Sequence, residues 1–493
     1  MNIKNLLLEK AEKFPLKPSI IFEDKTITFK ELKESVFLFS QYLLNSGIRK
    51  GDKVSIYLPN LPEYIISYLS IWNLGATAVP LDFMFTQSEL ENMILHSESK
   101  ILISAEKKGI DFEELKRKTN LKKIIFLEDF KNIDKNLKYK NSVQLNPEDL
   151  ALISYTSGTT GVPKGVMIPY ENLEIPPKNV DYFLDISESD ICLCSVPLSH
   201  AGGWVYLLLM LYKGVTVILM QRFEPLKFLK NIEKYKVTIF WIVPSMYIAL
   251  LVSKEIKKID LSSLKYAVVF GAPSSPHLLK KFHKFCPNAK LLNGWGMTET
   301  SAPNIVTSPS SEKIESVGKP VPWIELKIVD EDGKALGQNE IGELLIKGKG
   351  LFKGYYKNEE LTKASFTCDG FFKTGDLAKV DQEGFYYIVG RKKEMIKVGG
   401  EIVFENEIEK ALLTHPKVKD VAVIGVPDTL RGEVPKAFVV LKEKKTLSEF
   451  ELKEFLKSKL AHFKIPHYIE FVTELPKTRS GKINKELLRR KIQ

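Results

Sequence analysis

The chain has 493 residues, of which 44% are hydrophobic and 27% charged, with four cysteines and a formal net charge of +11. This length predicts two or more domains, and the composition excludes a disordered protein. The cysteines form no CxxC pair. This absence argues against a zinc site and fits a reducing compartment, so we expect a cytoplasmic protein.

The basic charge is concentrated near the C-terminal end. From Arg391 onward, 23 Lys and Arg residues stand against 15 Asp and Glu residues, which accounts for most of the surplus. They alternate with carboxylates along helical patterns such as residues 448–460, as is typical of solvated helix faces, so we expect no nucleic-acid partner. The longest apolar stretch, residues 207–220, is interrupted by Lys213 and Gly214, so no stable membrane insertion is expected.

Up to residue 390 the chain alternates apolar runs with amphipathic ones. Residues 1–15 predict an amphipathic helix rather than a signal peptide, and residues 207–220 predict a helix end followed by a core strand. Alternation of this kind is typical of a mostly parallel sheet covered by helices. Buried strands are expected at 53–59, 76–82, 100–106, 122–128, 216–220, 238–244, 265–273 and 289–296.

After residue 323 the pattern changes to short strands separated by Gly turns, which predicts an antiparallel β unit. Residues 389–403 hold four basic residues and a Gly-Gly pair and are interpreted as a hinge region. We therefore predict an α/β protein with a large N-terminal domain at 1–390, a hinge at 391–393, and a small mobile C-terminal α+β domain at 394–493.

Residues 155–165, YTSGTTGVPKG, predict a phosphate-binding loop. Its glycines allow successive N–H groups to turn toward an anion, and its hydroxyl side chains add donors. Short apolar strands are expected on both sides, at 151–154 and 165–168. The run is not a Walker A loop, because Lys164 follows a proline and precedes Gly165 rather than a serine or threonine.

Three further segments carry residues suited to nucleotide chemistry. In NGWGMTET (293–300), Trp295 offers a flat face for a base and Glu299 a carboxylate for Mg²⁺. In TGDLA (374–378), Asp376 suits ribose hydroxyls, and PKTRSGKIN (476–484) places Lys482 in a basic loop. Taken singly, each has a plainer interpretation: a core tryptophan, a turn aspartate and a surface lysine.

Together with GRKKEMIKVGGEI (390–402), these motifs stand in an order that resembles the adenylate-forming superfamily of AMP-binding enzymes, in its acyl-CoA synthetase branch. The resemblance covers essentially the whole chain. It implies activation of a carboxylic acid by ATP to acyl-AMP and pyrophosphate, then transfer to CoA with release of AMP. Mg²⁺ is the implied cofactor, and a homodimer is left open.

The resemblance also assigns roles to individual residues. Thr156 and Glu299 would place Mg²⁺, and Lys482 would bridge the α-phosphate and the attacking carboxylate. Lys393 would be the hinge residue, Lys397 would act in the second conformation, and Val398, Gly399 and Gly400 would line a CoA tunnel. The implied ATP- and AMP-binding residues are Thr156, Ser157, Gly158, Thr159, Thr160, Gly161, Lys164, Gly271, Ala272, Pro273, Asn293, Gly294, Trp295, Gly296, Met297, Thr298, Asp376 and Arg391.

The segment VPLSHAGGW (196–204) bears on the acid. Amino-acid-activating members usually carry an aspartate here for the substrate ammonium; this chain has His200, which disfavours amino acids because an unpaired buried ammonium is costly. Acetate-specific members place a bulky aromatic residue where this chain has Gly296, so the acid is expected to exceed two carbons. The expected acyl pocket comprises His200, Trp204, Phe240, Phe270 and Gly296, although such aromatic residues are often plain core.

The predicted activity is therefore an AMP-forming acyl-CoA synthetase for a medium- or long-chain fatty acid. An aryl-acid CoA ligase and a fatty acyl-AMP ligase that delivers to a carrier protein are the alternatives. A luciferase-like oxygenase and a nonenzymatic basic binding module are the more distant ones.

Overall fold

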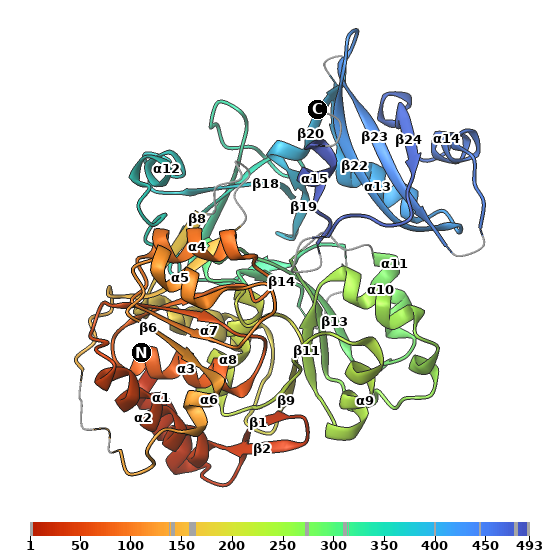
Figure 1. Ribbon diagram of the computed structural model, residues 1–493. Helices are drawn as coiled ribbons and strands as arrows, with labels where there is room; N and C mark the ends of the chain where they lie inside the picture. Colours follow the sequence, from red (N-terminus) through yellow and green to blue (C-terminus); the bar gives the residue numbers. More distant parts are fainter. Residues whose placement is uncertain are drawn as a thin grey trace.

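The protein was analysed as a computed structural model, which describes residues 3–137, 139, 143–156, 164–271, 276–308, 313, 315–398, 401–442, 445–477 and 482–490 (Figure 1). No helix among these residues is long and apolar enough to span a membrane. The predicted helix at the N-terminal end is confirmed as α1 (Ile3–Lys13).

One sheet has the strand order β6-β5-β3-β4-β7-β8. Its strands are β3 (Lys53–Tyr57), β4 (Thr77–Pro80), β5 (Ile101–Ser104), β6 (Lys123–Phe126), β7 (Leu150–Thr156) and β8 (Lys164–Pro169). All neighbours are parallel except the antiparallel pair β7 and β8. Every residue of β4 and β5 is buried, as expected for strands covered on both faces.

A second sheet has the order β15-β14-β13-β12-β11-β9-β10-β1-β2. Its strands from β13 to β1 run parallel, while β2, β14 and β15 add antiparallel edges. The bounds are β1 (Pro18–Phe22), β2 (Lys25–Thr28), β9 (Ile191–Cys194), β10 (Thr216–Leu219), β11 (Ile239–Ile242), β12 (Tyr266–Val269), β13 (Lys290–Trp295), β14 (Ile305–Val306) and β15 (Lys319–Pro320). The predicted strands and their mostly parallel arrangement are thus confirmed, although β6, at the edge of its sheet, has only Ile125 buried.

Helices between these strands are α2 (Phe29–Asn45), α3 (Pro62–Asn73), α4 (Gln87–Ser97), α5 (Phe112–Lys118), α6 (Leu127–Lys131), α7 (Ile175–Phe183), α8 (Ala201–Lys213), α9 (Pro225–Tyr235), α10 (Pro244–Val252) and α11 (Pro276–His283). Helix α8 ends at Gly214, whose φ of +78° suits a residue without a side chain. Strand β10 follows, so the helix and strand expected within 207–220 are both confirmed.

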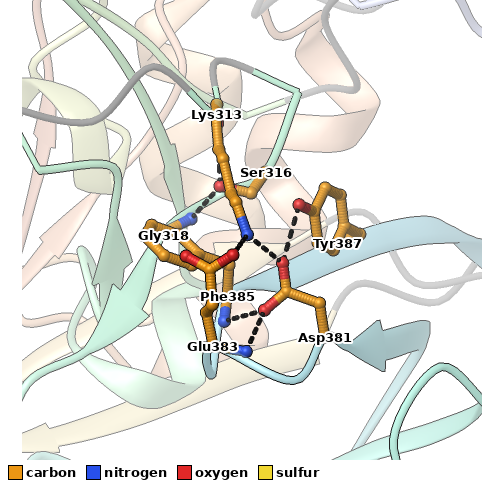
Figure 2. A network of polar contacts seen from close by, with 7 residues as sticks. All are labelled: Lys313, Ser316, Gly318, Asp381, Glu383, Phe385 and Tyr387. Atoms are coloured by element: carbon orange, nitrogen blue, oxygen red, sulfur yellow. Dashed lines mark hydrogen bonds and ion pairs between the residues drawn. The ribbon is translucent and has the colours of Figure 1, made fainter.

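The antiparallel β unit is also confirmed, with the order β16-β17-β18-β19. Its strands are β16 (Ile324–Val329), β17 (Gly342–Gly348), β18 (Phe372–Val380) and β19 (Tyr386–Arg391), with α12 (Glu359–Ala364) before β18. A polar network fastens the turn between β18 and β19 to the segment that precedes β15 (Figure 2). Lys313 Nζ lies 2.7 Å from carboxylate oxygens of both Asp381 and Glu383, and Tyr387 donates to Asp381.

The C-terminal unit is an α+β unit with the strand order β21-β20-β23-β22 and β24 paired to β23. Its elements are β20 (Met395–Val398), β21 (Glu401–Phe404), α13 (Glu405–Leu413), β22 (Val418–Asp428), β23 (Gly432–Leu441), α14 (Glu449–Lys457), β24 (Tyr468–Phe471) and α15 (Lys485–Arg490). In Figure 1 this blue unit stands beside β18 and β19.

Buried apolar side chains gather in separate clusters on the two sides of the predicted hinge. The largest cluster draws its buried members from Leu7 to Ala378, whereas another contains residues only from Ile396 onward. The short turn Lys392–Glu394 connects β19 to β20 between them. The C-terminal unit therefore has a hydrophobic core of its own.

Candidate active site

The two arms of the predicted phosphate loop are strands β7 and β8. Thr156, the last residue of β7, pairs with Lys164, the first residue of β8. The Lys164 ammonium lies 5.2 Å from the centre of the Tyr355 ring, a cation–π contact. The predicted ligands Ser157, Gly158, Thr159, Thr160 and Gly161 lie outside the described residues.

Trp295, Asp376 and Arg391 form a connected group: Trp295 and Arg391 end β13 and β19, and Asp376 lies within β18. Trp295 closes β13 and donates its indole N–H to Asp376 Oδ2 at 2.8 Å, while Arg391 Nε lies 2.6 Å from Asp376 Oδ1. Asp376 is only 4% exposed. Burial raises the pKa of its carboxyl, which Arg391 and Trp295 oppose. The structure thus brings together the residues expected around adenine and ribose.

Glu299 is a buried carboxylate in the turn after β13, which lies against β8. Its Oε1 accepts a hydrogen bond from the Tyr355 hydroxyl at 3.2 Å. Burial raises its pKa, while Tyr355, Arg391 and Lys164 favour the ionised form. Among the described residues, no group of three or more His, Cys, Asp or Glu side chains could hold a metal ion. The predicted pair, the Glu299 carboxylate and the Thr156 hydroxyl, still suits Mg²⁺, because this ion completes its coordination with waters and substrate phosphates.

Lys482 comes from the C-terminal unit and lies against the N-terminal domain. A methyl group added to Gly271, which has a φ of +81°, would lie 3.4 Å from Lys482 Cε and 3.7 Å from Nζ. Burial and Arg391 lower the pKa of Lys482, whereas Asp376 and Glu394 raise it. Lys482 is therefore brought to the group formed by Asp376 and Arg391. Ala272 and Pro273 lie outside the described residues.

The remaining predicted residues of this region belong to β13 and the turn after it. Asn293 is buried, and its side-chain amide donates to the carbonyl of Ser316 at 3.2 Å, so this group is used within the protein. Gly294 pairs with Val306 of β14. Met297 and Thr298 are half-buried.

His200 directly precedes α8 and pairs with a carboxylate that the sequence did not suggest. Its Nε2 lies 3.3 Å from Asp82 Oδ2. The Asp82 side chain is mostly buried, and its Oδ1 accepts the backbone N–H of Met84 at 2.9 Å. Asp82 is thereby placed to fix the orientation of the imidazole ring.

The aromatic residues of the expected acyl pocket have different surroundings. Phe270 packs on the backbone of Gly202, where an added methyl group would approach its ring to 2.5 Å. Phe240 instead packs among Phe228, Tyr247 and Phe282, so it belongs to the core. Its neighbour Trp241 points to the opposite sheet face and donates to the Gly202 carbonyl at 2.7 Å. Trp204 is fully buried.

Gly296 has a packing role that differs from the expected open pocket floor. A methyl group at this position would lie 2.6 Å from Ala302 Cβ and 2.8 Å from Asn304 Oδ1. The position next to Gly296 is therefore filled by protein, and its lack of a side chain gives no measure of the space available to the acid.

Residues expected to act after the domain turns lie elsewhere. Lys397 Nζ is 3.8 Å from Glu331 Oε1, and both side chains are exposed. Val398 is buried and pairs with Gly432, whereas Gly399 and Gly400 lie outside the described residues. Burial lowers the pKa of the predicted hinge residue Lys393. In this conformation Lys482, not Lys397, lies beside Gly271.

Sequence reasoning missed Tyr355 and Asp82. Tyr355 contacts both Glu299 and Lys164, yet it lies in an ordinary GYY run. Asp82 follows strand β4, and a polar residue just after a parallel strand was the available signal.

Known proteins resemble this chain over nearly its whole length. The AMP-binding enzyme family matches residues 7–356, and the AMP-binding enzyme C-terminal domain matches residues 407–482. A long-chain-fatty-acid–CoA ligase of Bacillus subtilis is 33% identical over 98% of this chain and 93% of the relative. A 2-succinylbenzoate–CoA ligase of Bacillus licheniformis is 34% identical over 99% of this chain and 100% of the relative.

Solved structures agree with the sequence relatives. An anthranilate CoA ligase in complex with anthranoyl-AMP superposes with a TM-score of 0.92 at 29% identity, over 100% of this chain and 97% of that one. The motif order, the lysine that the smaller unit brings to Asp376, and these matches lead to one assignment. The chain belongs to the adenylate-forming AMP-binding enzymes, in their CoA ligase branch, and is an AMP-forming acid–thiol ligase.

Proposed function

We propose that this enzyme activates a medium- or long-chain fatty acid with ATP and Mg²⁺ and then transfers the acyl group to CoA. The observation that carries the adenylation step is that Lys482 lies against Gly271, where the charges of Asp376 and Arg391 act on it, while Asp376 binds Trp295 and Arg391. It supports a site in which one cation from the C-terminal unit completes a nucleotide site made by the N-terminal domain.

In the proposed first step, an oxygen of the acid carboxylate attacks the α-phosphorus of ATP, and the bond to the leaving pyrophosphate breaks. Two anions must approach each other, so cations are needed where charge develops. Lys482 would neutralise the carboxylate and the α-phosphate, and Lys164 would bind the β- and γ-phosphates with the loop beginning at Thr156. Asp376 would accept hydrogen bonds from the ribose hydroxyls.

Glu299 and Thr156 would hold Mg²⁺. When bound, this ion neutralises phosphate charge and favours departure of pyrophosphate. The burial of Glu299 and its hydrogen bond from Tyr355 support this role, because they fix the carboxylate in one orientation.

In the proposed second step, the C-terminal unit turns at Lys393 and withdraws Lys482. Lys397 would then face the acyl-AMP, while Val398, Gly399 and Gly400 would line the channel for the CoA thiol. The thiol sulfur would attack the acyl carbonyl carbon and release AMP. The exposed ion pair of Lys397 with Glu331 supports such a motion, because a solvent-exposed pair costs little to break.

The identity of the acid has the least support from the contacts. His200, held by Asp82, and the half-buried Phe270 remain the residues proposed to face it. Relatives named for fatty acids and for aryl acids match this chain about equally, so an aryl acid is the second candidate. Cytoplasmic localisation and a homodimer stay predictions.

The test is acid-dependent exchange of labelled pyrophosphate into ATP across fatty, aryl and amino acids. We expect the highest rates with fatty acids of medium or long chain. Highest rates with aryl acids would favour the second candidate, and exchange with amino acids alone would contradict both. Adding CoA or a carrier protein to the acyl-AMP then identifies the acceptor.

A further inference from the structure

Lys482 is carried by a short segment with few apolar anchors: Ile483, which is partly buried, packs on the core of the C-terminal unit. Ile483 pairs with Lys477 in an isolated β-bridge, and the Asn484 N–H donates to the Pro476 carbonyl at 2.7 Å. Helix α15 begins at the next residue and has 6 residues in the described part of the chain, too few for a stable helix by itself. Leu488 is its one residue in the buried core of the C-terminal unit, within the described part of the chain.

An ion-pair cluster fastens this helix instead. Lys485 Nζ lies 2.9 Å from Glu405 Oε2 and 2.7 Å from Glu409 Oε1, and Arg489 lies 2.7 Å from Glu405 Oε1. The Lys485 side chain is 12% exposed and that of Glu405 only 2%. Glu405 and Glu409 both belong to α13, so the cluster joins α15 to α13.

The carboxylates of this cluster are themselves fixed by strand β22. The Val423 N–H donates to Glu409 Oε1 at 2.8 Å, and the Gly425 N–H approaches Glu405 Oε1 at 3.4 Å. Burial lowers the pKa of Lys485, but Glu409 and Glu405 together outweigh it and raise this pKa above the ordinary lysine value. Buried ion pairs add little net stability, because desolvation offsets their attraction, but they permit few alternative geometries.

The cluster lies next to the active-site lysine. Lys485 lies three positions after Lys482, which is at most about 11 Å along an extended chain. The charge of Glu394 acts on both lysines, so the cluster and the active site share an electrostatic environment.

We propose that Lys485 is a positioning residue for acyl-AMP formation: its ion pairs with Glu405 and Glu409 hold the segment that delivers Lys482 to the ATP site. The inference rests on the proposed function, since it takes Lys482 to act in the first half-reaction. A displacement of about 1 Å at a reacting group can cost about 100-fold in rate. Thioester formation from acyl-AMP does not use Lys482, so it should not depend on Lys485.

The experiment measures both half-reactions of the full chain: pyrophosphate exchange with dodecanoate, or with benzoate if the acid panel favours aryl acids, and CoA thioester formation from the matching acyl-AMP. For Lys485→Met and Glu409→Gln we expect a 10- to 100-fold fall in kcat of the exchange, with KM for the acid nearly unchanged, from about 1 Å of displacement. Thioester formation should stay within about twofold. Lys485→Arg keeps the charge and should restore the exchange.

Lys464→Met is the matched control, because Lys464 pairs with Glu407 of the same helix at 2.7 Å but lies outside the cluster. This control should leave both half-reactions unchanged. Equal losses in both half-reactions for Lys485→Met and Glu409→Gln would overturn the inference, as would full exchange activity in both variants. A wild-type chain without any acid-dependent exchange would instead overturn the proposed function, and the inference with it.

Discussion

The N-terminal domain and the C-terminal unit contribute to the candidate site in different ways. Trp295 ends β13, Gly271 follows β12 and Asp376 lies within β18, so the fold of the N-terminal domain fixes their relative positions. Lys482 reaches the same place from a segment outside that core, and its position depends on how the smaller unit docks. In the proposed mechanism, nucleotide recognition is therefore a property of one domain, whereas catalysis depends on an arrangement of two.

Lys482→Ala should have the largest effect, because it removes the contribution of the C-terminal unit and leaves that of the N-terminal domain. Acyl-AMP formation is expected to fall about 100- to 1,000-fold, because one cation is lost where charge develops. ATP binding should change little, since the N-terminal domain keeps its nucleotide contacts. Two stopped assays measure the effect on each step separately: acyl-AMP formation, and thioester formation from supplied acyl-AMP. A comparable loss of rate in both steps would contradict this prediction.

Asp376→Ala should affect nucleotide recognition in the N-terminal domain. Trp295 and Arg391 lose their common partner, and we expect kcat/KM for ATP to fall about 10- to 100-fold. Thermal unfolding should also begin earlier, since a buried hydrogen-bonding group loses its acceptor. Asp376→Asn keeps an acceptor for Trp295 and serves as the milder control. An unchanged kcat/KM for ATP in the alanine variant would speak against the assignment.

The pH dependence of the first step tests the environment of Lys482. Its pKa lies below the ordinary lysine value because of burial and Arg391, while Asp376 and Glu394 oppose the shift. As pH rises through this lowered pKa, the ammonium loses its proton, so kcat/KM of acyl-AMP formation should fall by up to about tenfold per pH unit. Lys482→Arg should move this alkaline fall to higher pH. An alkaline limb that is identical in both proteins would assign it to another group.

Gly202→Ala should have the smallest effect and concerns the acid alone. The added methyl group would press on the Phe270 ring, which must move. We expect a change of about two- to tenfold in the relative kcat/KM of long and short acids, with KM for ATP unchanged. Competition between two acids in one reaction measures this ratio directly. A uniform loss with every acid would indicate damage to the helix start rather than to the acyl site.

Much of the fold could be predicted because its signals are local. The run from Ile101 to Ala105, for example, has no charged residue, as is typical of strands covered on both faces. The antiparallel unit after residue 323 was predicted from its Gly turns and short strands in the same way. Hydrophobic burial stabilises these elements, and the apolar pattern of each segment indicates that burial without information from the rest of the chain.

Side-chain partners could not be predicted so well. Phe240 and Trp241 face opposite sides of β11. The period of a strand predicts that neighbouring side chains point to opposite faces, but it does not indicate which of the two faces the proposed acyl site. Gly296 suggested free space, but Ala302 and Asn304 occupy it after the chain turns back. Pairs such as His200 with Asp82 join residues 118 positions apart, and a single sequence carries no signal for such contacts.

The most direct measurement is the identification of products from ATP and an acid panel, with and without CoA, by mass spectrometry. We predict acyl-AMP and pyrophosphate without CoA, and acyl-CoA and AMP in equal amounts when CoA is added. Formation of ADP and phosphate, or release of AMP that does not depend on the acid, would contradict it.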